Sequence, residues 1–273
     1  MSRLRDFHRR GVLVTGASSG IGRALSLRVA ARGARVGLVA RRAEALEALA
    51  EEIREAGGEA VALPCDVADR EAALHCARLA AERIGPVDVL VNNAGYGHHR
   101  RFLDWDLDDM ERMMRVNYSG ALFFTKALLP AMVLRGRGWI VMVSSLAGRI
   151  ATPGESAYAA SKHAMRALGQ SISLEVEDAG VHVLNVYPGV IDTPFFDAEA
   201  LARMPDTAKR GMAPPEKLVE AILAALASGR RELTWPRWLG VGPLTGALAP
   251  AMLRAGMRRT ALRALDAEEE DAT

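Results

Sequence analysis

The stretch GVLVTGASSGIGRALSLRVAARG, residues 11–33, places an apolar run, a glycine-rich turn and an amphipathic segment in direct succession. The first part, GVLVTG (11–16), is typical of a buried β-strand. The second part, IGRALSLRVAARG (21–33), has the apolar spacing of a helix and stops at a glycine. The stretch therefore predicts a strand–turn–helix unit, which is the repeating element of an α/β sheet.

The turn itself, TGASSGIG (15–22), has glycines at the places where a side chain would obstruct it. Gly16 permits the tight turn, Gly20 lets a ligand approach the backbone, and Gly22 lets the helix pack close to the strand. The N–H groups at the start of the helix, together with the helix dipole, favour a pyrophosphate. We therefore expect the phosphates of a dinucleotide at this turn.

The alternation of apolar runs and amphipathic segments continues along the chain. Apolar runs at 34–42, 60–67, 87–95, 138–145 and 181–189 alternate with helical patterns at 43–58, 70–85, 106–135, 156–178 and 215–229. Continuous apolar strands separated by helices indicate a parallel sheet buried on both faces, which right-handed crossovers make doubly wound. We predict an α/β fold, a Rossmann-type doubly wound parallel sheet of six to seven strands with helices on both faces. The seventh strand, near 230–235, has the weakest signal.

The sequence predicts one domain followed by an extension. We expect residues 1–235 to form a single Rossmann-type domain, with a dinucleotide-binding half at about 10–100 and a second half, at about 101–235, that would supply any catalytic and substrate-binding groups. Residues 192–214 fit no regular element and are placed to close over a ligand at the carboxyl edge of the sheet. Residues 236–273 form a C-terminal extension with an apolar segment and an acidic tail.

Composition and charge exclude several classes of protein. Hydrophobic residues make up 50% of the chain and charged residues 25%, as in ordinary globular proteins, and the formal net charge is +2. The arginines are scattered, so we predict no nucleic-acid partner. Cys65 and Cys76 form neither a disulfide framework nor a C-x-x-C site, which predicts reduced thiols in a cytoplasmic protein. No apolar leader follows the basic N-terminus, so we expect no signal peptide.

The end of the second predicted strand distinguishes between two coenzymes. An acidic residue there would bind the ribose hydroxyls of NAD, whereas an arginine suits the 2′-phosphate of NADP. This sequence has Ala40 at the position of the acid, followed by Arg41 and Arg42. We therefore predict NADP(H); the alternative is that both arginines are solvated residues that open the next helix.

Six further motifs follow the glycine-rich turn, each at the end of a predicted strand or in the helix after it. They are CDV (65–67), NNAG (92–95), VNYSG (116–120), VSSLAG (143–148), YAASK (158–162) and YPGVIDT (187–193). Together with the turn, they resemble the classical short-chain dehydrogenase/reductase family across about residues 10–230. The resemblance implies an oxidoreductase that acts on a CH–OH group with NADP(H), and a homodimer or homotetramer. It identifies a reaction type and leaves the substrate open.

The resemblance also assigns roles to individual residues. The catalytic residues that it implies are Asn117, Ser145, Tyr158 and Lys162. Besides Tyr158 and Lys162, the residues that it implies for coenzyme binding are Gly16, Ser18, Ser19, Gly20, Ile21, Gly22, Arg41, Arg42, Asp66, Val67, Asn93, Ala94, Gly95, Pro188, Gly189, Val190, Ile191 and Thr193. In this assignment Ser145 orients the substrate oxygen, and Asn117 holds the water through which protons reach solvent.

Hydride transfer to a carbonyl explains why these residue types are needed. An alkoxide develops on the oxygen and requires a proton together with hydrogen-bond donors. A free phenol, with a pKa of about 10, is a poor acid–base catalyst near neutrality. We expect the ammonium of Lys162, one helical turn from Tyr158, and the positive nicotinamide of the oxidised coenzyme to lower the pKa of that phenol.

The second half of the chain favours an apolar, lipid-like or steroid-like ketone or secondary alcohol as the substrate. SSLAGRIATPG (144–154), YPGVIDTPF (187–195) and the apolar extension are similar to segments of family members that reduce such ketones. One alternative is a 3-oxoacyl thioester reductase of the same family. Another is a non-catalytic NADP-binding sensor or scaffold, which the intact Tyr158 and Lys162 disfavour.

The apolar segment 238–253 is shorter than the ~20 residues that a spanning helix needs, and Pro243 and Pro250 interrupt it. We predict a peripheral membrane contact through it, which adds membrane association to the expected cytoplasmic location. Two alternatives stay open at this point, because the segment would equally suit a subunit interface or a cover over the pocket.

Two adjacent histidines raise the question of a metal site. The side chains of His98 and His99 diverge, and no cysteine or carboxylate stands at metal-ligand spacing from them. We predict no metal and a polar rim near the substrate entrance.

Overall fold

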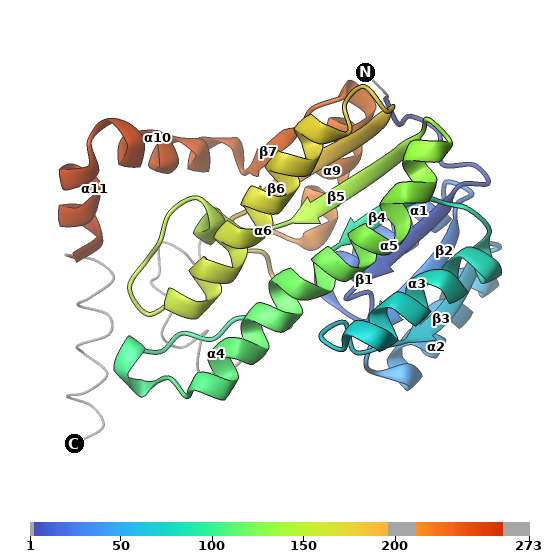
Figure 1. Cartoon of the computed structure of the whole chain (residues 1–273), viewed down its shortest axis with the longest axis horizontal. Coiled ribbons are helices and arrows are strands. Elements are labelled where there is room, and N and C mark those ends of the chain that lie inside the picture. The colour runs from blue at the N-terminus through green and yellow to red at the C-terminus, as the bar shows by residue number, and fades with distance from the viewer. Residues whose placement is uncertain (1–2, 196–210, 259–273) are drawn as a thin grey trace.

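Seven parallel strands form one sheet in the computed structural model, which describes residues 3–195 and 211–258 (Figure 1). The strands are β1 (Gly11–Thr15), β2 (Arg35–Ala40), β3 (Glu59–Pro64), β4 (Val87–Asn92), β5 (Gly138–Val143), β6 (Val181–Pro188) and β7 (Glu232–Trp235). Their spatial order is β3-β2-β1-β4-β5-β6-β7. The chain order reverses between β1 and β4, and sheets of this kind bind ligands beyond the carboxyl ends of the strands at such a reversal.

Helices cover both faces of the sheet. One face carries α1 (Gly20–Ala30), α2 (Ala43–Glu55) and α9 (Pro215–Ser228). The other face carries α3 (Arg70–Ile84), α5 (Gly120–Leu134) and α6 (Ser156–Glu175), which lie in front of the sheet in Figure 1. The predicted α/β doubly wound sheet is therefore confirmed, and β7 is the strand with the weakest signal in the sequence.

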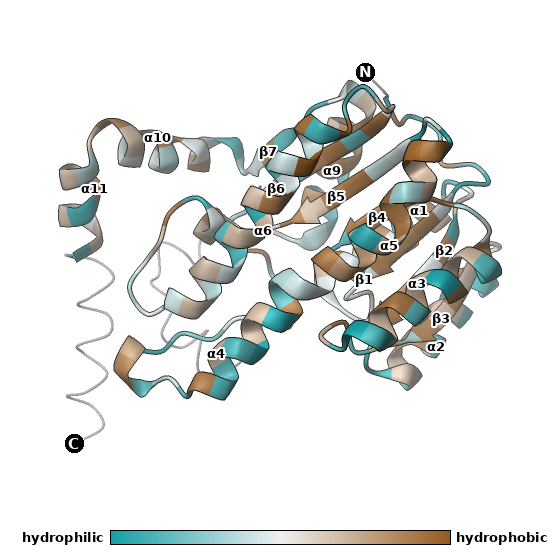
Figure 2. Ribbon diagram, viewed as in Figure 1, coloured by the Kyte–Doolittle hydropathy of each residue, from teal (hydrophilic) through white to brown (hydrophobic). Residues whose placement is uncertain are grey.

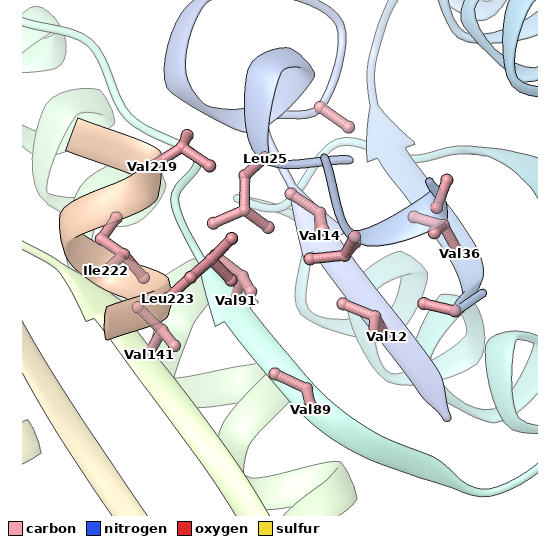
Figure 3. Packing of buried hydrophobic residues seen from close by; sticks show 14 of the residues in the cluster. Val12, Val14, Leu25, Val36, Val89, Val91, Val141, Val219, Ile222 and Leu223 are labelled. Carbon is pink, nitrogen blue, oxygen red and sulfur yellow. The ribbon is translucent and has the colours of Figure 1, made fainter. Parts of the chain in front are cut away.

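The apolar runs of the sequence become strands that are buried on both faces. In β1, Val12 and Val14 face α1 and α9, whereas Leu13 faces α3 and α5, and all three are fully buried. Figure 3 shows the first cluster, with Val219 and Ile222 of α9 pointing toward the strands. In Figure 2 the strands are largely brown, which shows that hydrophobic residues make up most of the sheet. Each buried side chain of this kind contributes about 1.5–3 kcal/mol, which makes the sheet a rigid support for the loops at its edge.

Local signals set the ends of the helices. The carboxylate of Asp69 accepts the backbone N–H of Ala72 at 3.0 Å and so caps the start of α3. Gly229, with a φ of +75°, adopts the left-handed conformation that ends α9. Both helices therefore begin and end within a residue of the pattern in the sequence.

The helical pattern at 106–135 proves to contain two helices. Helix α4 (Leu107–Met114) is separated from α5 by a π-helical turn, η2 (Arg115–Ser119). Asn117 lies in this wider turn and is fully buried. The helical region predicted over 106–135 is confirmed, but the widened turn inside it was not predicted, because apolar periodicity does not distinguish a single widened turn from regular helix. The predicted helix 156–178 similarly ends earlier, at Glu175.

After β7 the chain forms the 3-10 turn η4 (Arg237–Gly240) and the short helices α10 (Val241–Leu248) and α11 (Pro250–Met257). These elements extend from the body of the molecule at the left of Figure 1. Within residues 3–195 and 211–258, no helix combines the length and the apolar character that crossing a membrane would require. The acidic tail and most of the segment 192–214 lie outside the described residues.

Candidate active site

A cavity of about 800 Å³ opens at the carboxyl edge of the sheet, among the segments that follow the six strands from β1 to β6. Two of the predicted site residues, Gly22 and Asn117, do not line it. The predicted residues that do are Gly16, Ser18, Ser19, Gly20, Ile21, Arg41, Arg42, Asp66, Val67, Asn93, Ala94, Gly95, Ser145, Tyr158, Lys162, Pro188, Gly189, Val190, Ile191 and Thr193. The fold therefore brings residues from the whole length of the domain to one place.

The glycine-rich turn has the geometry that its sequence requires. Gly16 and Gly20 have φ angles of +67° and +54°, which side chains disfavour. Gly22 lies behind the turn, where an added Cβ would come within 2.3 Å of the Gly16 carbonyl oxygen. Ser19 starts α1 without a side-chain cap, so the N–H groups of the first helical turn are open to an anion. The turn therefore fits the phosphates of a dinucleotide.

Thr15 and Asn93 fasten this turn to the neighbouring strand. The Thr15 hydroxyl donates to the Val91 carbonyl and accepts the backbone N–H groups of Asn93 and Ala94, both at 3.0 Å. The Asn93 amide donates to the carbonyls of Thr15 and Gly16 at 3.0 and 3.3 Å. The Asn93 side chain thus holds the shape of the turn, a role that the NNAG motif does not reveal from sequence.

The outer end of the cavity carries two arginines where β2 ends. Ala40 ends the strand, and Arg41 and Arg42 follow it, both exposed. Arg42 donates from Nη2 to the Ser18 hydroxyl at 3.0 Å, which places its guanidinium across the glycine-rich turn. Arg41 lines the cavity beside it. A cationic site at this end of the cavity suits a phosphate group.

Asp66, after β3, is held by a residue that the sequence analysis missed. Arg112 of α4 donates to its carboxylate at 2.5 Å, and the backbone N–H of Ala68 donates to it at 3.0 Å. Burial acts to raise the pKa of Asp66, but these two hydrogen bonds and the charges of Arg112 and Arg41 together outweigh it, and the pKa lies below its ordinary value. The carboxylate is therefore charged and fixed in place beside the cavity. Its partner is 46 residues away along the chain, so no local motif indicates it.

Tyr158 and Ser145 meet at the inner end of the cavity. Tyr158 lies in the first turn of α6, and its ring packs on Phe195 with 5.7 Å between ring centroids. Ser145 follows β5, and its Oγ accepts the backbone N–H of Ala147 at 3.1 Å. This bond uses the oxygen as an acceptor, so the hydroxyl proton is available to a second oxygen. The Ser145 side chain hydrogen-bonds to the Tyr158 hydroxyl.

The predicted lowering of the Tyr158 pKa is wrong for the chain on its own. Burial raises the pKa of this phenol far above its ordinary value; the hydrogen bond from Ser145 lowers it, and the charge of Glu155 raises it further. The phenol is 9% exposed, and removal from water disfavours its charged form. Sequence spacing locates Lys162 one turn away but does not reveal this burial. Tyr158 is therefore a neutral phenol that can donate a proton.

Lys162 is buried beside the tyrosine and fixes α6 to β5. Its Nζ donates to the Val143 carbonyl at 3.1 Å and lies 5.8 Å from the centroid of the Tyr158 ring. The Ser144 hydroxyl donates to the Lys162 backbone carbonyl at 2.9 Å. Burial lowers the pKa of Lys162 to about 8. A proton can thus leave this amine close to physiological pH.

Asn117 does not line the cavity, and its side chain is bonded on both ends to neighbouring segments. The Asn117 amide nitrogen donates to the Tyr96 carbonyl and to the Ser161 hydroxyl, both at 2.9 Å. The Asn117 Oδ1 accepts the Tyr96 N–H at 3.0 Å. The π-helical turn therefore holds the loop after β4 against α6, and the water that Asn117 is predicted to hold stays a prediction.

Apolar residues that the sequence analysis did not assign line the rest of the cavity. They include Tyr96, Leu146, Ile150, Pro194, Phe195 and Met257. Their place next to known motifs was the only available signal, since Leu146 follows Ser145 and Pro194 follows Thr193. The sequence gives no comparable signal for Met257, because it comes from the C-terminal extension.

Polar groups line the rim as well. His98 and His99 both reach the cavity, and His99 Nε2 lies 3.6 Å from the carboxylate of Glu155. The Thr152 hydroxyl also hydrogen-bonds to Glu155. Across the described part of the chain, no three His, Cys, Asp or Glu side chains gather in a way that would hold a metal ion. Cys65 lines the cavity too, and it is a buried free thiol.

Comparisons with known proteins agree on a family. The family model for short chain dehydrogenases matches residues 10–203. A Bos taurus protein, "Dehydrogenase/reductase SDR family member 7B", is 38% identical over 244 residues, which cover 85% of this chain and 75% of that protein. A metagenomic short-chain oxidoreductase solved in complex with NADP has a TM-score of 0.72 at 31% identity, over 84% of this chain and 97% of the other.

A second solved structure supports the fold alone. A short-chain dehydrogenase/reductase from Burkholderia phymatum, in complex with NAD, has a TM-score of 0.83 at 23% identity, over 91% of this chain and 96% of that one. Fold, family model and relatives therefore lead to one conclusion: this chain belongs to the short-chain dehydrogenase/reductase family.

Proposed function

We propose that this chain is an NADP(H)-dependent oxidoreductase that interconverts an apolar ketone and the corresponding secondary alcohol. The observation that carries the proposal is the arrangement of Ser145, Tyr158 and Lys162 at the inner end of the cavity. A hydroxyl donor, a neutral phenol and a buried amine with a lowered pKa lie together there. This is the set of groups that an oxygen gaining negative charge requires.

The coenzyme would lie along the cavity. The turn from Gly16 to Gly22 would hold its pyrophosphate, and the segment from Pro188 to Thr193 would lie against its nicotinamide. Gly20 supports this arrangement because an added Cβ would meet Thr193 at 3.0 Å, so the turn and the segment are already in contact. When bound, the coenzyme supplies or accepts the hydride.

The chain's own residues handle the proton. Ser145 donates its hydroxyl hydrogen to the substrate oxygen and so orients the carbonyl. Tyr158 gives its phenolic proton to the same oxygen as negative charge develops there. Lys162 supplies a positive charge beneath the phenol and favours the phenolate that remains. Burial raises the pKa of Tyr158, so the phenol carries the proton that reduction of a carbonyl consumes.

The coenzyme preference follows from the residues at the end of β2. Ala40 cannot accept a hydrogen bond from a ribose hydroxyl with its side chain, whereas Arg41 and Arg42 can bind a 2′-phosphate. The metagenomic relative that is 31% identical was solved with NADP, which supports the same choice. We therefore propose that NADPH is used in preference to NADH.

The substrate class follows from the apolar part of the cavity lining. Ile150, Phe195 and Met257 present apolar surface to the cavity, beside polar residues such as His99 and Glu155. A lipid-like or steroid-like ketone fits this surface. A 3-oxoacyl thioester is the related alternative.

A panel of carbonyl compounds tests the proposal. Aliphatic ketones, steroid ketones, acyl thioesters and sugars would each be mixed with the protein and NADPH, and coenzyme oxidation followed by absorbance, with NADH run alongside. We expect turnover with an apolar ketone and a higher kcat/KM for NADPH. Binding of NADPH without turnover of any carbonyl would support the sensor instead, and preference for NADH would contradict the role of Arg41.

A further inference from the structure

The C-terminal arm, which we define as residues 237–258, presents a row of large apolar side chains to solvent. These side chains are Trp238, Val241, Leu244, Leu248 and Met252, and each is at least 58% exposed. None of the residues in η4, α10 or α11 is buried. Figure 1 shows both helices extending away from the sheet, and Figure 2 shows their mixed apolar character. A single exposed leucine needs no explanation, but a contiguous set indicates a contact surface.

The two sides of α10 differ in side-chain size, which fixes the direction of the apolar row. Gly242 and Gly246 lie on one side, where an added Cβ would be 2.8 Å from Ile150 and 2.9 Å from Leu253. Val241, Leu244 and Leu248 follow the i, i+3, i+7 spacing of the opposite side. The small residues therefore face the protein, and the large ones face outward.

The charges of the arm are all of one sign. Arg237, Arg254 and Arg258 are exposed, and the sequence from 237 to 258 contains no acidic residue. A second copy of the same surface would bring arginines against arginines, whereas anionic headgroups would neutralise them. Trp238 stands at the base of the row, and indole rings favour the boundary between headgroups and acyl chains.

The arm is also continuous with the catalytic cavity. Met257 of α11 lines the cavity, and so does Ile150, which contacts the glycine side of α10. At its other end, Leu239 of η4 lies against Gly189, where an added Cβ would be 2.4 Å from its Cδ1. The surface that faces outward and the wall of the cavity are thus two sides of the same segment.

We propose that the C-terminal arm docks on an anionic lipid surface, with Leu244 and Leu248 entering the acyl boundary and the three arginines at the headgroups. Helices α10 and α11, of 8 residues each, lie along the surface rather than across it. Docking in this way places the mouth of the cavity at the lipid. The docking does not depend on the proposed reaction, and its test needs neither coenzyme nor substrate.

Vesicle sedimentation tests the docking. The full-length protein would be incubated with vesicles of phosphatidylcholine and phosphatidylglycerol, and with vesicles of phosphatidylcholine alone, before centrifugation. We expect the protein to sediment with the anionic vesicles, and Leu244→Glu to reduce its partition coefficient at least about tenfold. Arg254→Gln should reduce binding to the anionic vesicles by about fivefold and leave binding to neutral vesicles unchanged.

The matched control is Leu134→Glu, since Leu134 is an exposed leucine at the end of α5, outside the arm. It should sediment like the unmodified protein. Each variant would be checked by its thermal unfolding midpoint, because the exposed positions should leave folding unchanged. The proposal is overturned if the unmodified protein stays in the supernatant with anionic vesicles, or if Leu134→Glu reduces binding as much as Leu244→Glu. It is equally overturned if Leu244→Glu changes only the oligomeric state seen by light scattering, which would make the arm a contact between copies.

Discussion

The inner and outer ends of the cavity are built in opposite ways. At the inner end, Tyr158 and Lys162 are 9% and 3% exposed and are held by Ser145 and the Val143 carbonyl. At the outer end, the arginines after β2 are exposed and the turn has open N–H groups. Burial changes the pKa of the inner groups, whereas solvent screens the outer charges. We therefore expect substitutions at the inner end to change turnover, and substitutions at the outer end to change coenzyme binding.

The largest effect is expected at the inner end, from Tyr158→Phe. The ring and its packing on Phe195 remain, but the proton that the substrate oxygen receives is lost. We expect kcat to fall by about 10³-fold, as for other general acids, with NADPH binding changed by less than about threefold. Steady-state rates and fluorescence titration of NADPH measure the two quantities. If Tyr158→Phe kept the kcat of the unmodified protein, Tyr158 would not be the proton donor.

Lys162→Met is expected to have the next largest effect, a fall in kcat of about 10²-fold or more, because it removes the positive charge beneath the phenol.

Lys162→Met should also change how the free energy of unfolding depends on pH. Lys162 has a folded-state pKa of about 8, below the ordinary 10.5, so between these values the unfolded chain binds the extra proton. The free energy of unfolding should therefore rise from about pH 8 to pH 10.5 through this group.

The pH dependence of urea unfolding checks this sign. The unmodified protein should gain stability over that interval relative to Lys162→Met, and the difference between the two should be constant below pH 8. If the free energies of unfolding of the two proteins changed in parallel from about pH 8 to pH 10.5, burial would not lower the pKa of Lys162.

At the outer end, Arg41→Ser should act on coenzyme choice alone. We expect the Kd for NADPH to rise by about 10- to 30-fold, the value of one charged hydrogen bond in a partly solvated site, with the Kd for NADH unchanged. The control is Arg54→Gln, since Arg54 is an exposed arginine on α2 that pairs with Glu47 and Glu51. If Arg41→Ser raised the Kd for NADPH and the Kd for NADH equally, Arg41 would not bind the 2′-phosphate.

The smallest effect is expected from Glu155→Gln. Its charge raises the pKa of Tyr158 but is the last of the three causes, after burial and the Ser145 hydrogen bond. The pH profile of kcat should move to lower pH by less than about one unit, without loss of its maximum. A shift of the profile to higher pH would mean that the charge of Glu155 does not raise the pKa of Tyr158.

Much of the fold follows from the sequence, and so does the set of residues that reach the cavity. The strands are continuous apolar runs, and the site residues stand at their ends, so a parallel sheet places them at one edge without further information. Even the arginines after Ala40 follow from this rule.

Packing between distant segments accounts for what the sequence did not reveal. The burial that raises the Tyr158 pKa depends on the loop after β4 and on Phe195. The Arg112 bond to Asp66 and the Asn117 bonds to Tyr96 join segments that no local pattern relates. The widened turn at Asn117 shares the apolar periodicity of a helix.

Transfer of deuterium from the coenzyme to the product tests whether this chain passes a hydride to a carbonyl with Tyr158 as the proton donor. The best ketone of the panel would be reduced with NADPH that carries deuterium at both C4 positions, and the alcohol analysed by mass spectrometry and NMR. Hydride transfer at the inner end of the cavity predicts an alcohol with one deuterium on the carbinol carbon, formed about 10³-fold more slowly by Tyr158→Phe. An alcohol without the label, or an equal yield of labelled alcohol from the variant, would contradict the account.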